Sequence, residues 1–108
     1  MDYQMEGALA KEFYDDCLST LLKKANDYAS NTDCFSNFKF ISQIVKTPIE
    51  KTFLTFLAVK IARLSELVVE MKEAKNESIE DTLKDLANYA CLMAIYLKER
   101  NNGRNETS

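Results

Sequence analysis

Two cations and two carboxylates recur at helical spacing in the second half of the chain. Lys60 and Arg63 are three residues apart within an apolar pattern, and Asp81 and Asp85 are four apart, with Asn88 one step further. Residues three or four apart lie on one helix face, so each pair presents its charges together. A cation within an apolar face is costly unless an anion pairs with it, so Lys60 requires a carboxylate or a bound anion.

These charges suit a magnesium site that holds phosphates. Two carboxylates facing two more across a helix pair supply the oxygen ligands that Mg²⁺ prefers, and the ion in turn binds substrate phosphates. Asp81 and Asp85 on one helix would complete such a site with Glu66 and Glu70 on the preceding helix. The two cations would then contact the same phosphates directly.

The same residues also allow a structural interpretation. Arg63 and Asp85 would form an interhelical ion pair, and Lys60 would extend its ammonium group to solvent. Asp81 would interact with the dipole of its own helix. The sequence does not decide between these interpretations, because a shift of one turn between the helices exchanges the partners of Asp85.

Four amphipathic segments must position these residues. Apolar residues recur three and four apart in a chain with only 2 Gly and 1 Pro, which predicts an all-α fold. We expect an antiparallel four-helix bundle with a long central helical hairpin, formed by helices near residues 6–29, 36–46, 48–74 and 78–100. Residues 1–100 would form a single domain. Residues 101–108 would be a disordered tail that begins at Asn101-Asn102-Gly103.

Capping signals mark the starts of the last two helices. Thr47-Pro48-Ile49-Glu50 has the spacing of a capping box, with Thr47 as the N-cap and Pro48 at the first helical position. Ser78 is a good N-cap residue and precedes acidic residues, which the helix dipole favours in a first turn. Both signals predict sharply defined helix starts.

Asn37 is a further polar candidate. It stands between Phe35 and Phe38 in a segment crowded with aromatic residues. A polar amide in such surroundings must find hydrogen-bond partners or offer them to a ligand. The segment is therefore either a plug of the core or part of a binding site, and both interpretations stay open.

Composition and charge restrict the class of protein. The 14 basic residues are scattered among 17 acidic ones, with a net charge of −3, which disfavours a nucleic acid polymer as partner. No apolar run approaches the ~20 residues that span a membrane, and no signal peptide is recognisable, so we expect a cytoplasmic protein without membrane contact. Cys17, Cys34 and Cys91 lack His partners and Cys-x-x-Cys spacing, which indicates reduced core thiols.

Apolar residues on the 48–74 segment predict self-association. Phe53, Phe56, Leu57 and Val59 place apolar side chains on more than one side of this helix. A monomer of this size cannot cover all of them. We therefore expect a homo-oligomer.

Four segments together resemble small, mostly phage-encoded MazG-like proteins, often described as nucleotide-modification-associated or dATP/dGTP pyrophosphohydrolase-like. They are Lys24-Ala25-Asn26-Asp27-Tyr28, Asp33-Cys34-Phe35-Ser36-Asn37-Phe38, Lys60-Ile61-Ala62-Arg63-Leu64 and Asp81-Thr82-Leu83-Lys84-Asp85-Leu86-Ala87-Asn88-Tyr89. The resemblance implies an all-α nucleotide-binding domain that forms dimers or tetramers. It also implies Mg²⁺ between the phosphates and carboxylates, with water attacking the α-phosphorus to release pyrophosphate.

The resemblance also implies roles for individual residues. The catalytic residues would be Asp81 and Asp85, which would bind the metal with Glu66 and Glu70. The nucleotide would be bound by Lys60, Arg63, Asp27, Asn37, Asn88 and Tyr89. In the wider superfamily, however, the long helix carries Glu-x-x-Glu where this chain has Lys60 and Arg63.

That exchange of carboxylates for cations weakens a divalent metal site and favours phosphate. Two functions follow from it. The expected one is a Mg²⁺-dependent (deoxy)nucleoside triphosphate pyrophosphohydrolase of phage type. The alternative is a non-catalytic protein that sequesters a nucleotide, such as a phage sponge for host immune signalling nucleotides. A purely structural helical assembly would leave Lys60 and Asn37 without a purpose.

Overall fold

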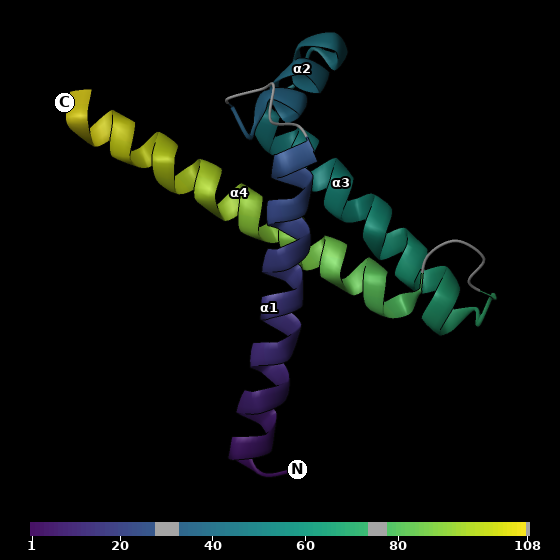
Figure 1. Ribbon diagram of the computed structural model, residues 1–108. Helices are drawn as coiled ribbons and strands as arrows, with labels where there is room; N and C mark the ends of the chain where they lie inside the picture. Colours follow the sequence, from purple (N-terminus) through teal and green to yellow (C-terminus); the bar gives the residue numbers. More distant parts are fainter. Residues whose placement is uncertain (28–32, 74–77, 108) are drawn as a thin grey trace.

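The computed structural model describes residues 1–27, 33–73 and 78–107, and every regular element in these ranges is helical. The elements are α1 (Tyr3–Asp27), α2 (Ser36–Val45), α3 (Ile49–Leu64), the π-helical turn η1 (Ser65–Val69) and α4 (Ile79–Thr107). The all-α prediction is confirmed. Figure 1 shows α3 leading to one end of the molecule, α4 returning from that end, and α1 crossing α4. None of these helices is long and apolar enough to cross a membrane.

An aromatic core lies where α2, α3 and α4 meet. Phe53 on α3 is fully buried, and Phe35 and Phe38 are buried beside it. The rings of Phe38 and Phe53 stack with their centroids 4.5 Å apart, and Tyr96 of α4 lies 5.7 Å from Phe53. Rings that interlock in this way bury a large apolar area and contribute most of the packing energy of a small core. A hydroxyl pair from the same helices, Ser42 and Thr52, is also buried.

Two predicted helix ends are wrong. The helix predicted over residues 48–74 ends earlier, because it widens into η1 and the chain then leaves the helix with Met71 at a positive φ of 55°. The adjacent β-branched Val68 and Val69 lose side-chain freedom in a helix, which weakens its continuation there. At the other end of the chain, α4 continues through residues 101–107, the predicted disordered tail. Gly103 does not end the helix, because it lacks the positive φ of a C-cap glycine.

The predicted capping box at Thr47 is also wrong. Pro48 is the N-cap of α3 and makes no side-chain hydrogen bond, while its carbonyl accepts the N–H groups of Lys51 and Thr52. The N–H of Thr47 instead donates to the carbonyl of Ser42 in α2, so Thr47 belongs to the turn between the helices. The cap of α4 is confirmed, since Ser78 Oγ accepts the N–H of Asp81 at 3.0 Å.

The three cysteines are free thiols in different surroundings. Cys17 is buried on α1, and burial raises the pKa of its thiol even though Lys84 opposes the shift. Cys34 and Cys91 are exposed. The prediction of core thiols is therefore correct for Cys17 alone.

The chain is more extended than is typical of a compact domain of its length. Its radius of gyration is 16.4 Å, whereas about 13 Å is typical for a folded domain of this size. Its accessible surface is 8321 Å², compared with about 6,100 Å² for a compact monomer of this mass. Figure 1 shows one reason, which is that the N-terminal half of α1 stands away from the other helices.

Candidate functional site

Lys60 and Asp85 face each other from α3 and α4. Lys60 Nζ lies 3.0 Å from Asp85 Oδ2, and the two side chains are only 17% and 22% exposed. Lys24 of α1 approaches the other carboxylate oxygen, Oδ1, at 3.8 Å. One carboxylate therefore lies between two ammonium groups from different helices. We call this arrangement of Lys24, Lys60 and Asp85 the three-helix junction.

An aromatic contact next to the junction fixes how α3 and α4 are aligned along their lengths. Phe56 precedes Lys60 by one turn of α3, and Tyr89 follows Asp85 by one turn of α4. The rings of Phe56 and Tyr89 pack with their centroids 5.3 Å apart. Packing of these two rings brings the adjacent turns together, so Asp85 meets Lys60. The sequence alone does not determine this alignment of the two helices. The packing of the aromatic rings determines it.

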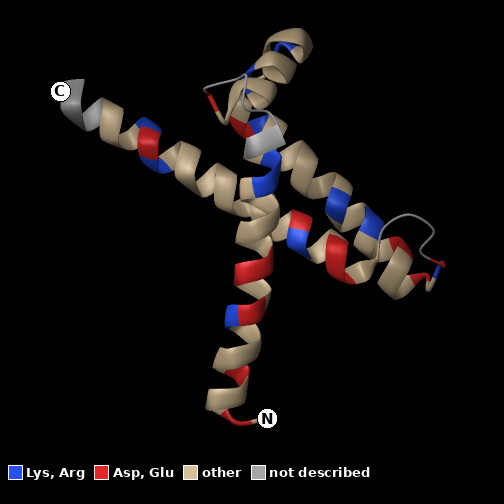
Figure 2. Ribbon diagram, viewed as in Figure 1, with Lys and Arg blue, Asp and Glu red and all other residues tan. Residues whose placement is uncertain are grey.

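Asp85 pairs with Lys60 and not, as the structural interpretation predicts, with Arg63. The Nη1 of Arg63 lies 3.4 Å from Glu66 Oε2 within the same helical segment. Such a short-range pair between partly exposed groups is weak. Figure 2 shows the basic residues in the second half of α3 alongside the charged first turns of α4. Arg63 therefore lies one turn from Lys60, and its guanidinium group is held by this weak pair with Glu66.

The four carboxylates predicted to bind Mg²⁺ do not converge. Within the part of the chain that the structure describes, no three His, Cys, Asp or Glu side chains are grouped so as to hold a metal ion. Asp85 contacts two lysines, Glu66 contacts Arg63, and Glu70 contacts Lys72 at 3.6 Å. Asp81 is exposed on the first turn of α4. Within one chain, the described residues therefore do not gather these four carboxylates around a metal ion.

Asn88 and Tyr89 serve the packing of the helices. Asn88 Nδ2 donates to the backbone carbonyl of Cys17 at 3.0 Å, which joins α4 to α1. Tyr89 is partly buried and its ring packs against Phe56 and, at 6.4 Å, against Phe38. Both residues lie within one turn of Asp85, as their spacing predicts, but their described contacts are with protein groups.

Two further predicted site residues are Asn37 on α2 and Asp27 at the end of α1. Asn37 is exposed on the first turn of α2, outside the buried aromatic core. No contact among the described interactions joins Asn37 to Lys60 or Asp85. Asp27 is the last residue of α1, and its side chain lies outside the described residues.

A second contact between α1 and α4, an ion pair, was not predicted from the sequence. Lys84 Nζ lies 3.4 Å from Asp16 Oδ2 and 3.6 Å from Glu80 Oε1. Burial disfavours the charged lysine, but the hydrogen bonds and charges of these two carboxylates outweigh it and raise the pKa of Lys84. No local signal predicts the pairing of Lys84 with Asp16, because the two residues are far apart in the sequence.

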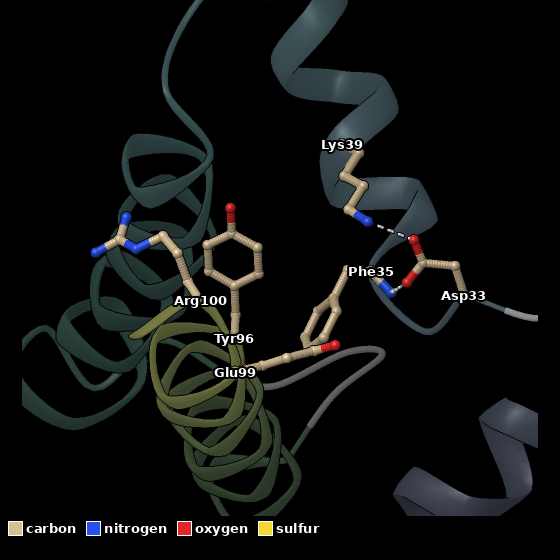
Figure 3. A pocket seen from close by; sticks show the side chains of 6 residues that line it. All are labelled: Asp33, Phe35, Lys39, Tyr96, Glu99 and Arg100. Atoms are coloured by element: carbon tan, nitrogen blue, oxygen red, sulfur yellow. Dashed lines mark hydrogen bonds and ion pairs between the residues drawn. The ribbon is translucent and has the colours of Figure 1, made fainter. Parts of the chain in front are cut away.

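A polar pocket of about 380 Å³ lies where the start of α2 meets α4. Figure 3 shows Asp33 and Lys39 on one side of it and Tyr96, Glu99 and Arg100 on the other. Lys39 Nζ contacts Asp33 Oδ2 at 2.6 Å, and this bond holds the pKa of Asp33 below its usual value. Arg100 pairs with Glu50 of α3. Both cations of the pocket therefore have protein partners: Lys39 pairs locally at the start of α2, and Arg100 joins α4 to α3.

Comparisons with protein-family models, curated proteins and solved structures give no match for this chain. Of the predicted site residues, the structure brings Lys60 and Asp85 into contact and keeps Arg63, Asn88 and Tyr89 within one turn of them. The structure also brings Lys24 to Asp85, although Lys24 was not among the predicted site residues. The three-helix junction is therefore the strongest candidate site.

Proposed function

We propose that this protein binds a nucleotide through its phosphates at the three-helix junction. The observation that carries the proposal is the convergence of two ammonium groups, Lys24 of α1 and Lys60 of α3, at the carboxylate of Asp85 on α4. A phosphate bound to ammonium groups forms charge-assisted hydrogen bonds, which are stronger than neutral ones. The resemblance to MazG-like proteins supports a nucleoside triphosphate, or another nucleotide with several phosphates, as the ligand.

Arg63 is placed to join the bound phosphates. It lies one turn from Lys60, and its pair with Glu66 is a weak contact between neighbours on the same helical segment. Release of this pair costs little, and a guanidinium group can bind two phosphate oxygens at once. Arg63 would thus extend the phosphate site beyond the first phosphate group.

Binding without cleavage is the form of this function that the geometry supports best. It is supported by the predicted carboxylate ligands, which among the described residues are dispersed or paired with cations and are not grouped for a metal ion. Pyrophosphohydrolysis is the second candidate. It is favoured by the exposed carboxylate of Asp81, which stands one turn from Asp85 and is open to further ligands from another chain.

The extended protomer supports a homo-oligomer as the working form. Its surface and radius of gyration exceed those of a compact monomer. We infer a MazG-like antiparallel helical bundle that becomes compact only when copies of the chain associate. The host cytoplasm, where nucleotides are abundant, is the compartment that this function requires.

A retention assay tests the proposal and separates its two forms. Pure protein is incubated with single dNTPs, NTPs and cyclic dinucleotides, with and without Mg²⁺, and the complex is then separated by gel filtration and heat-denatured. Release of intact nucleotide under every condition supports sequestration. Release of pyrophosphate that requires Mg²⁺ and disappears in Asp85→Asn supports hydrolysis. Retention of no nucleotide contradicts both forms.

A further inference from the structure

Asp85 occupies the ammonium groups that would bind a phosphate. Its Oδ2 lies 3.0 Å from Lys60 Nζ, and its Oδ1 lies 3.8 Å from Lys24 Nζ. A phosphate oxygen bound to an ammonium group lies at nearly the same distance as the first of these, about 2.8 Å. The carboxylate therefore takes the position next to Lys60 that a phosphate oxygen would take. An incoming phosphate must either displace Asp85 or bind beside it.

The backbone that carries Asp85 is fixed from two sides. Tyr89, one turn later on α4, packs against Phe56 of α3 with the ring centroids 5.3 Å apart. The side chain of Asn88 donates to a backbone carbonyl of α1 at 3.0 Å. An aspartate side chain is short, so a change of rotamer moves its carboxylate only a small distance when the backbone is fixed. A phosphate bound to Lys60 would therefore keep this carboxylate as a close neighbour.

Partial burial strengthens the repulsion between this carboxylate and a phosphate. The side chains of Lys60 and Asp85 are only 17% and 22% exposed. Water and salt screen charges less in such surroundings than at the surface. Like charges therefore oppose each other more strongly here than beside Arg63, whose partner Glu66 is 44% exposed. Of these two carboxylates, that of Asp85 is the stronger obstacle to phosphate binding.

We propose that Asp85 is an internal competitor of the nucleotide and limits the affinity of the three-helix junction for phosphate. This inference rests on the proposed binding of nucleotide phosphates at the junction. Without a ligand, Asp85 pairs with Lys60 and joins α4 to α3. A nucleotide binds when its phosphate takes Lys60 from the carboxylate, together with the more distant Lys24. The same carboxylate thus stabilises the unliganded fold and opposes binding of the ligand.

Calorimetric titration of wild type and Asp85→Asn with dATP and dGTP tests this inference. The buffer contains EDTA in place of Mg²⁺, so that metal-dependent hydrolysis does not occur. Asp85→Asn should bind the preferred nucleotide at least about tenfold more tightly than wild type, because the neutral amide does not repel the phosphate. The matched control is Asp16→Asn, which changes the net charge equally and breaks another ion pair between α1 and α4, that with Lys84. Its affinity should equal that of wild type.

Two further variants distinguish competition from a general loosening of the helices. Asp85→Ser is a second neutral variant and should also bind more tightly than wild type. Adding Lys60→Ala to Asp85→Asn should remove the gain, because Lys60 is the group that the carboxylate releases to the phosphate. Circular dichroism checks that every variant stays helical. Equal or weaker binding by both neutral variants would overturn this inference and leave the proposed function standing, whereas nucleotide binding by none of the proteins would overturn both.

Discussion

Lys60 Nζ lies 3.0 Å from Asp85 Oδ2, and this partly buried ion pair joins α3 to α4 one turn from the aromatic core. Lys24 adds a second ammonium group to the same carboxylate. The same contacts that join the three helices therefore hold two ammonium groups at the proposed phosphate site.

Asp85→Asn should lower the free energy of unfolding by about 1–2 kcal/mol, between the values typical of exposed and of buried ion pairs. The reason is that Lys60 loses its close partner while remaining largely covered. Urea denaturation measures the change. The control is Asp15→Asn, which removes an exposed pair with Lys11 and should cause no measurable change. Equal losses in both variants would show that the junction contributes no more than a surface pair.

Phe53→Ala should lower the free energy of unfolding by about 3–5 kcal/mol, the usual cost of removing a buried phenylalanine ring. Phe53 is fully buried and contacts the rings of Phe35, Phe38 and Tyr96, so its loss opens a cavity at the meeting point of three helices. Thermal unfolding followed by circular dichroism measures the effect. Leu54→Ala, at the exposed neighbouring position, should change the melting temperature little. A similar shift in both variants would contradict the position of the core.

Helix positions were predictable because they depend on local periodicity. The apolar spacing gave four helices in nearly the right places, and Ser78 capped α4 as expected. The ends of α3 and α4 were not predictable, since a π-helical turn and a helical Gly103 depend on backbone geometry that several local sequences can adopt. Thr47 was wrongly predicted as the N-cap of α3. Its N–H group instead donates to the carbonyl of Ser42 in α2.

The site was only partly predictable because its contacts are long-range. The need of Lys60 for an anion was evident from its apolar surroundings, and Asp85 meets that need. The choice of Asp85 over other carboxylates depends on the packing of Phe56 against Tyr89, which no local pattern contains. For the same reason, the approach of Lys24 from another helix was missed.

Asp33 should give the start of α2 a dependence on acid pH. The hydrogen bond from Lys39 lowers the pKa of Asp33 in the folded protein, so the charged carboxylate stabilises the fold above its unfolded pKa of about 4. This contribution is lost as the pH falls through the lowered pKa. Urea titrations at about pH 6 and about pH 3 should therefore show a larger loss for wild type than for Asp33→Asn.

Lys39→Met provides the matched partner variant for this pH experiment. It removes the largest cause of the lowered pKa of Asp33, whereas the N–H of Phe35 still donates to the carboxylate. Its loss of stability on acidification should therefore lie between those of wild type and Asp33→Asn. Identical pH dependence in wild type and both variants would show that this pair does not couple the fold to pH.

Calorimetric titration of wild type and Lys60→Ala with dATP, dGTP and a cyclic dinucleotide is the most direct test of nucleotide binding at the three-helix junction. The control is Lys51→Ala, an exposed lysine on the same helix. If Lys60 binds phosphate, its removal should weaken binding of the preferred nucleotide at least tenfold, about 1.4 kcal/mol, while Lys51→Ala binds as wild type does. Equal affinities in all three proteins, or no binding of any of these nucleotides by wild type, would contradict the proposed function.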